Sequence, residues 1–267
     1  MRASALFVLA LWTAAPARAA LEDIGRITMG RTTFPRHAWV LDLFEDEVVP
    51  RWAIPVGHTL SQRVVAAYGV TDRLSVGLIE TTLHAERSTL NTLKADEWGG
   101  FAGYRVLDEP FEFTPLLVAL PVAPNKKAAF VVGGDLLKNV GNWTFHLGYI
   151  DEFEQGEGET AYGGNHHIVE PGVFCRFGLH GLVGVHYMYQ TFPAMVSTIP
   201  TPFGSIPVTT PAGDIQMWGP VLGGSISKNL FLGLEQRFGM TRQSPAYMTT
   251  LQFQIYFGPY ALGSWGL

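Results

Sequence analysis

The stretch Tyr247–Phe257, with the sequence YMTTLQFQIYF, decides the fold. Because successive side chains of a β-strand point to opposite sides, alternate residues define its two faces. One face has Leu251 and Phe253 in its middle and aromatic residues at both ends. The opposite face is more polar and consists of Met248, Thr250, Gln252, Gln254 and Tyr256. An apolar face with aromatic ends is typical of a strand that crosses a lipid bilayer in a β-barrel.

The same alternation recurs in three earlier segments, Trp143–Tyr149, Val183–Tyr189 and Leu230–Met240. In the last of these, Gln236 is the exception on an otherwise apolar face. An exported soluble β-sandwich would also alternate. It would not usually place aromatic residues at both ends of the apolar faces, so the pattern favours a membrane barrel.

Strand-like segments recur along the whole chain, and the connections between them alternate between short and long. About five tight turns and six longer loops are what twelve antiparallel strands require when both termini lie in the periplasm. We therefore predict an all-β fold, a transmembrane up-and-down antiparallel barrel of about 12 strands (range roughly 10–14). The predicted strands are Ala38–Phe44, Gln62–Gly69, Leu74–Thr82, Trp98–Val106, Phe111–Val122, Ala128–Leu137, Trp143–Glu152, His166–Phe177, Leu182–Gln190, Ile215–Ile226, Leu230–Met240 and Tyr247–Phe257.

The composition supports a wall that faces lipid. The chain is 47% hydrophobic and 12% aromatic and has 30 glycines, but only 15% of its residues are charged. A soluble domain usually carries about a quarter charged residues. The single Cys175 excludes an intramolecular disulfide framework, and a net charge of −5 argues against nucleic acid as a partner.

The amino terminus has the features of a secretory signal. Met1 and Arg2 precede an apolar stretch that is too short to span a bilayer, and Ala17-Arg18-Ala19 suits signal peptidase. We therefore predict export to the cell outer membrane. The predicted organisation is a cleaved signal peptide (1–19), a periplasmic segment or small plug (20–37), the barrel (38–257), and an extension of the last strand or a tail (258–267).

One hairpin carries a family resemblance. The sequence YGVTDRLSVGL, Tyr68–Leu78, resembles the recurrent turn of a family of outer-membrane barrels linked to the "MetA-pathway of phenol degradation". The segments EPGVFCRFG (Glu170–Gly178) and SKNLFLGLEQRFGM (Ser227–Met240) have a similar cadence. The resemblance covers Val64 to Phe257 and implies passive uptake of small molecules, hydrophobic or aromatic ones included. From the residues themselves, Thr71 and Asp72 can cap the turn through their own backbone.

Several charged or titratable residues fall mid-strand on the face that the alternation turns away from lipid. A mid-bilayer arginine on the lipid face would cost roughly 2–4 kcal/mol. Such groups can form a constriction that selects solutes, or a ladder of salt bridges that fills a narrow lumen. The predicted lumen-facing residues are Glu112, Asp135, His146, Glu170, Arg176, His186, Glu235 and Arg237.

The histidines give little support to catalysis. No serine lies close to His146 in the sequence, and the chain contains no Asp-His dipeptide. The adjacent His166 and His167 point to opposite faces of a strand and so cannot readily share a metal ion. We predict that the protein is not an enzyme and has no cofactor and no metal site.

Two functions remain open. The first is a passive channel or transporter for small molecules, and the second is a closed structural or adhesive barrel whose extracellular loops do the work. The Pro- and Thr-rich segment Thr191–Gly213 is predicted to be extended rather than helical, and it suits either function. The expected partners are outer-membrane lipid, the barrel-assembly machinery and a small-molecule solute.

Overall fold

A computed structural model of the chain describes the residues from 33 to 258 with several gaps. The described ranges are 33–49, 59–85, 94–108, 111–120, 129–154, 166–177, 181–192, 195–201, 204–210, 212–227 and 229–258. The predicted signal peptide, most of the predicted plug and all but the first residue of the predicted carboxyl-terminal extension lie outside these residues.

Every regular element among the described residues is a β-strand. The strands are β1 (Trp39–Val49), β2 (Thr59–Gly69), β3 (Leu74–Ala85), β4 (Lys94–Tyr104), β5 (Glu112–Leu120), β6 (Ala129–Val140), β7 (Trp143–Glu154), β8 (His166–Phe177), β9 (Gly181–Phe192), β10 (Met195–Thr201), β11 (Gly204–Thr210), β12 (Gly213–Ser227), β13 (Leu230–Gly239) and β14 (Tyr247–Phe257). None of the described residues forms a helix that is long and apolar enough to cross a membrane.

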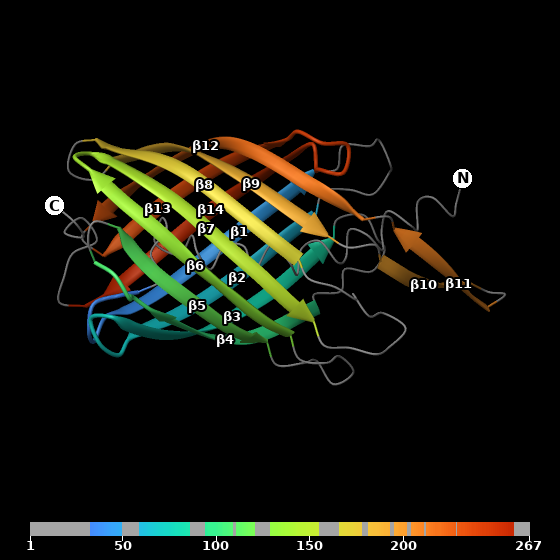
Figure 1. Cartoon of the computed structure of the whole chain (residues 1–267), viewed down its shortest axis with the longest axis horizontal. Helices are drawn as coiled ribbons and strands as arrows, with labels where there is room; N and C mark the ends of the chain where they lie inside the picture. Colours follow the sequence, from blue (N-terminus) through green and yellow to red (C-terminus); the bar gives the residue numbers. More distant parts are fainter. Residues whose placement is uncertain are drawn as a thin grey trace.

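Twelve of the strands form a closed antiparallel barrel, with each strand beside its neighbours in sequence (Figure 1). β1 closes the barrel by pairing with β14 along its whole length, from Trp39↔Phe257 to Val49↔Tyr247. β10 and β11 form a separate two-stranded sheet between β9 and β12 that projects beyond one end of the barrel. The predicted fold, an all-β up-and-down barrel of about 12 strands, is confirmed.

Two connecting segments differ from the prediction. β1 continues past Phe44 to Val49, so Asp46 lies in the barrel wall and not in a loop. The run Glu45–Glu47 has low strand propensity, but Phe44, Asp46 and Val48 continue the buried face and the pairing with β14. The segment Thr191–Gly213 is extended as predicted, but most of it pairs into the β10–β11 hairpin.

The strand alternation separates an inner from an outer face. On β7, His146 is 5% exposed, whereas the adjacent Leu147 is 43% exposed. The inner apolar side chains include Val40, Val65 and Val118, all buried, and the outer face carries Trp39 and Phe257. This is the arrangement of a barrel whose outer wall contacts lipid.

The hairpin between β2 and β3 forms the turn that the sequence indicates. The Thr71 hydroxyl oxygen accepts hydrogen bonds from the backbone N–H groups of Arg73 (3.1 Å) and Leu74 (2.9 Å). Asp72 does not cap its own turn; its carboxylate accepts the N–H of Arg36 at 3.0 Å. The segment that leads into β1 is thereby held against this turn.

The same segment enters the mouth of the barrel at the turn end. Phe34 is 1% exposed, and its N–H donates to the hydroxyl of Ser75 at 2.8 Å. Gly69 makes this approach possible, because a Cβ there would lie 2.0 Å from the carbonyl oxygen of Pro35.

The first prediction concerns the outer wall of the barrel. Leu147 lies mid-strand on the outer face, so Leu147→Arg places a charge near the middle of the lipid layer. The substitution should destabilise the barrel by roughly 2–4 kcal/mol. Val140→Arg, on the same face at the end of β6, should cost about 1 kcal/mol or less. Denaturant unfolding in lipid vesicles measures both. Equal costs for the two variants would contradict this placement of the wall in the membrane.

Candidate functional site

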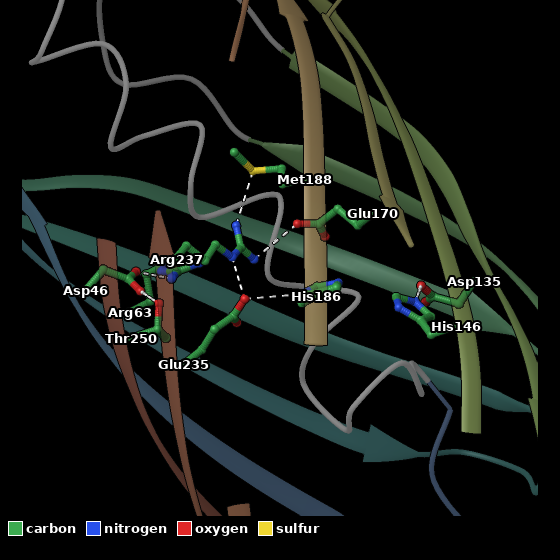
Figure 2. A network of polar contacts seen from close by, with 10 residues as sticks. All are labelled: Asp46, Arg63, Asp135, His146, Glu170, His186, Met188, Glu235, Arg237 and Thr250. Carbon is green, nitrogen blue, oxygen red and sulfur yellow. Dashed lines mark hydrogen bonds and ion pairs between the residues drawn. The ribbon is translucent and has the colours of Figure 1, made fainter. Parts of the chain in front are cut away.

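The inner face of the barrel carries a network of buried polar side chains (Figure 2). Among the described residues, the buried charged groups are six carboxylates and two guanidinium groups. The carboxylates belong to Asp42, Asp46, Glu112, Asp135, Glu170 and Glu235, and the guanidinium groups belong to Arg63 and Arg237. A buried charge is tolerated where it is paired or hydrogen-bonded, so the contacts of these groups define the site.

Arg237 lies at the centre of the first cluster. Its Nε donates to Oε1 of Glu235 at 2.5 Å, and its Nη2 donates to Oε1 of Glu170 at 3.3 Å. Nη1 contacts Sδ of Met188 at 3.2 Å. The same oxygen of Glu235 lies 3.3 Å from Nδ1 of His186. β13 is therefore linked across the lumen to β8 and β9, which are not its neighbours in the sheet.

A second cluster lies on β1, β2 and β14. Arg63 forms an ion pair with Asp46 and lies over the ring of Phe44, 5.1 Å from its centroid. The Thr250 hydroxyl donates to the other oxygen of Asp46 at 2.5 Å. Asp42 accepts hydrogen bonds from the side-chain amides of Gln252 (3.0 Å) and Gln254 (2.9 Å). The polar face of Tyr247–Phe257 thus supplies the donors for the acids of β1.

A third contact joins β6 and β7, where Nε2 of His146 lies 2.9 Å from Oδ1 of Asp135. The rings of His146 and His186 have their centroids 5.9 Å apart. Both histidines line a cavity with about 40 Å³ open to water-sized molecules, together with Phe44, Phe174, Val221, Gly233, Leu234, Glu235, Thr250 and Gln252. Phe44 on β1 and His146 on β7 come from opposite sides of the barrel. The lumen is therefore narrow at this level.

The structure brings six of the eight predicted lumen residues into this network. Asp135, His146, Glu170, His186, Glu235 and Arg237 are all buried on the inner face. The other two do not lie mid-strand as predicted. Glu112 is the first residue of β5, 4.0 Å from Nη1 of Arg105, and Arg176, next to last in β8, donates to the carbonyl oxygen of Gly141 at 3.3 Å. Both lie at the turn end of the barrel, because each is at or next to the end of its strand.

Three charged residues of the network were not predicted, namely Asp42, Asp46 and Arg63. Their signal is the alternation of WVLDLFEDEVV, in which Asp42 and Asp46 share a face with Val40 and Phe44. The predicted strand ended at Phe44 and so excluded Asp46, whereas Asp42 lay within that strand on the face of Val40 and Phe44 and was missed. Arg63 then follows, because it lies opposite Phe44 on β2.

Of the adjacent His166 and His167, the side chain of His167 lies on the outer face. His167 contacts Asp151 (3.2 Å) and the hydroxyl of Tyr149 (3.2 Å) near the loop end of β7 and β8. Within the described part of the chain, no three or more His, Cys, Asp or Glu residues are grouped so that they could hold a metal ion.

The fold and the lumen define a transmembrane antiparallel β-barrel of twelve strands. No protein-family model and no curated protein matches the sequence. Among solved structures, the chain is similar to an outer membrane channel from Pseudomonas putida F1, with a TM-score of 0.61 and 9% identity over 84% of this chain and 97% of that one. It is also similar to the NanC porin (TM-score 0.56, 10% identity, 82% and 99% covered) and the KdgM porin (0.50, 11%, 82% and 98%). At these identities the similarity shows the fold.

Prediction on the network. Arg237 is fully buried between two carboxylates, so Arg237→Met removes a buried positive charge and should destabilise the barrel by about 3 kcal/mol or more. Arg73 and Asp108 form a comparable pair, but their side chains are 50% and 45% exposed. Arg73→Met should therefore cost about 1 kcal/mol or less. Denaturant unfolding of both variants tests this, and a smaller loss for Arg237→Met than for Arg73→Met would contradict the assigned contacts.

Proposed function

We propose that the protein is a passive channel of the outer membrane for small molecules. The observation that carries this proposal is the cavity between opposite walls of a closed barrel, lined by polar groups and aromatic rings. A polar interior behind a wall of exposed apolar side chains is the design of barrels that conduct solutes. Its narrow section would limit passage to small solutes.

Two further observations support a channel. The solved structures with a similar fold include proteins named as an outer membrane channel and as porins. The resemblance of Tyr68–Leu78 to barrels linked to phenol degradation adds small aromatic molecules to the proposed solutes.

A closed structural or adhesive barrel is the second candidate, and one observation favours it. The β10–β11 hairpin extends beyond the barrel on the side of the longer connections, where it is placed to contact other molecules (Figure 1). For this function the lumen network would serve as packing alone.

Prediction on location. A folded membrane barrel resists detergent until it is boiled, because its closed ladder leaves no edge at which unfolding can start. The protein should fractionate with outer membranes and migrate differently on a gel before and after boiling. Recovery in the soluble periplasmic fraction, with identical mobility in both lanes, would contradict the proposed location.

Prediction on conductance. Val221 lines the lumen cavity and is 7% exposed, whereas the next residue, Leu222, points outward and is 51% exposed. In planar bilayers the wild-type protein should conduct, and Val221→Trp should reduce its single-channel conductance by about half or more because the ring fills the cavity. Leu222→Trp adds the same group to the lipid face and is the matched control.

The outcomes separate the two candidate functions. Heat-modifiable gel mobility first shows that each variant has folded. A folded wild-type protein without any conductance would refute the channel and favour the closed barrel. Conductance that Val221→Trp and Leu222→Trp change equally would refute a pathway through this cavity.

A further inference from the structure

The segment that leads into β1 lies inside the mouth of the barrel at the turn end. Thr33 and Phe34 are only 5% and 1% exposed, although both precede the first strand. Phe34 belongs to the same buried apolar cluster as Ala67, which lies on the inner face of β2. A ring that is buried at the mouth occupies space that a solute must cross to enter or leave the lumen at this end.

Small residues in the wall determine where Phe34 lies. Gly69 and Ser75 pair with each other across β2 and β3, and both are buried on the inner face. The hydroxyl oxygen of Ser75 accepts the N–H of Phe34 at 2.8 Å. A Cβ on Gly69 would lie 2.7 Å from the carbonyl oxygen of Phe34, so any larger residue there would push the segment away from the wall.

Further hydrogen bonds hold the segment to β2 and to the turn that follows it. They join the N–H of Arg36 to the carboxylate of Asp72 (3.0 Å), the N–H of His37 to the carbonyl oxygen of Gly69 (2.8 Å), and Nδ1 of His37 to the hydroxyl of Tyr68 (2.8 Å). The pairing of β1 with β2 and with β14 begins only at Trp39. The segment can therefore leave the mouth without breaking any pairing of the wall.

A tight turn gives the segment a place to bend. The N–H of Ala38 donates to the carbonyl oxygen of Pro35 at 3.0 Å, and His37 has a φ of 65°. This left-handed conformation is unfavourable for histidine because its Cβ lies close to the following carbonyl oxygen. A change of backbone angles at His37 would relieve this strain and move Phe34 away from the wall.

We propose that the segment Thr33–His37 is a gate at the turn end of the channel, and that the ring of Phe34 limits the size of the solutes that pass it. This inference rests on the proposed channel and adds a second narrow level to it. Along the inner face of β1, Val40 and Asp42 separate Ala38 from Phe44, which lines the cavity. A solute that crosses the cavity therefore meets the gate at a different level of the barrel.

Removal of the Phe34 ring tests the gate directly. Phe34→Ala retains the backbone contact with Ser75 but empties the mouth, so the single-channel conductance in planar bilayers should rise by about 1.5-fold or more. Phe177→Ala is the matched control, because Phe177 is the last residue of β8 at the same end of the barrel and is 55% exposed on the outer face. The control should retain the wild-type conductance.

Polyethylene glycols of graded size measure the width of each mouth, because a polymer that enters the channel lowers its conductance. Each polymer is added to one side of the bilayer at a time. Phe34→Ala should raise the size cut-off from one side only, since the gate lies at one end of the barrel. Equal changes from both sides would contradict this position of the gate.

A double variant tests whether the segment moves. Asp72→Ala/Ser75→Ala removes two side chains that accept hydrogen bonds from the segment and leaves the Phe34 ring in place. The channel should then spend about twofold more time or longer in a state of higher conductance, because water replaces these hydrogen bonds when the segment leaves the mouth. Val76→Ala is the control, since Val76 follows Ser75 and is 38% exposed on the outer face.

The outcomes separate the gate from the channel itself. Heat-modifiable gel mobility first shows which variants have folded, and the double variant tests the gate even if Phe34→Ala fails to fold. Folded wild-type and variant proteins that all lack conductance would refute the channel and the gate together. A conducting protein whose conductance is the same in Phe34→Ala and Phe177→Ala would refute the gate alone. An unchanged distribution of conductance states in the double variant would refute the movement.

Discussion

The structure depends on one constraint, that backbone N–H and C=O groups in the hydrocarbon layer must pair with each other. Water is absent there, and each unpaired group costs several kcal/mol. The pairing of β1 with β14 meets this constraint by removing both edges of the sheet. Two prolines within the strands are exceptions, because proline has no N–H to donate. Pro171 interrupts the pairing of β8 with β9, and Pro220 interrupts the pairing of β12 with β13. At both positions the strand still pairs with its neighbour on the other side, β7 for Pro171 and β9 for Pro220.

Closure also separates the two faces, and this separation allows charges within the bilayer. Glu170 and Arg237 lie on strands that cross the membrane, and lipid contact would be costly for both. Inside the barrel they meet each other across the lumen at 3.3 Å. The link between β13 and β8 ties together parts of the wall that share no backbone hydrogen bonds. The inner network thus stabilises a particular cross-section of the barrel as well as its own charges.

The sequence predicts the wall better than it predicts the network inside. The alternation in Tyr247–Phe257 assigns each side chain to a face, and short turns place successive strands side by side. Alternation says nothing about height or about the opposite wall, so the contacts of Arg237 with Glu170 could not be deduced, although both residues were predicted to face the lumen. The prediction ended the first strand at Phe44 because the acidic run that follows is typical of a loop, whereas β1 continues to Val49. The β10–β11 hairpin was missed because prolines obscured its pairing.

Gln236 shows that polarity alone does not distinguish the two faces. It points outward from β13, yet its side-chain oxygen accepts the hydroxyl of Thr249 at 2.8 Å, and its amide donates to the carbonyl oxygen of Met248 at 3.3 Å. A neutral side chain can therefore remain on the lipid face when the wall itself satisfies it. The inner face follows the same rule, because Asp42 accepts hydrogen bonds from the side-chain amides of Gln252 and Gln254. A buried polar side chain is thus tolerated on either face where neighbouring groups of the barrel supply its hydrogen-bond partners.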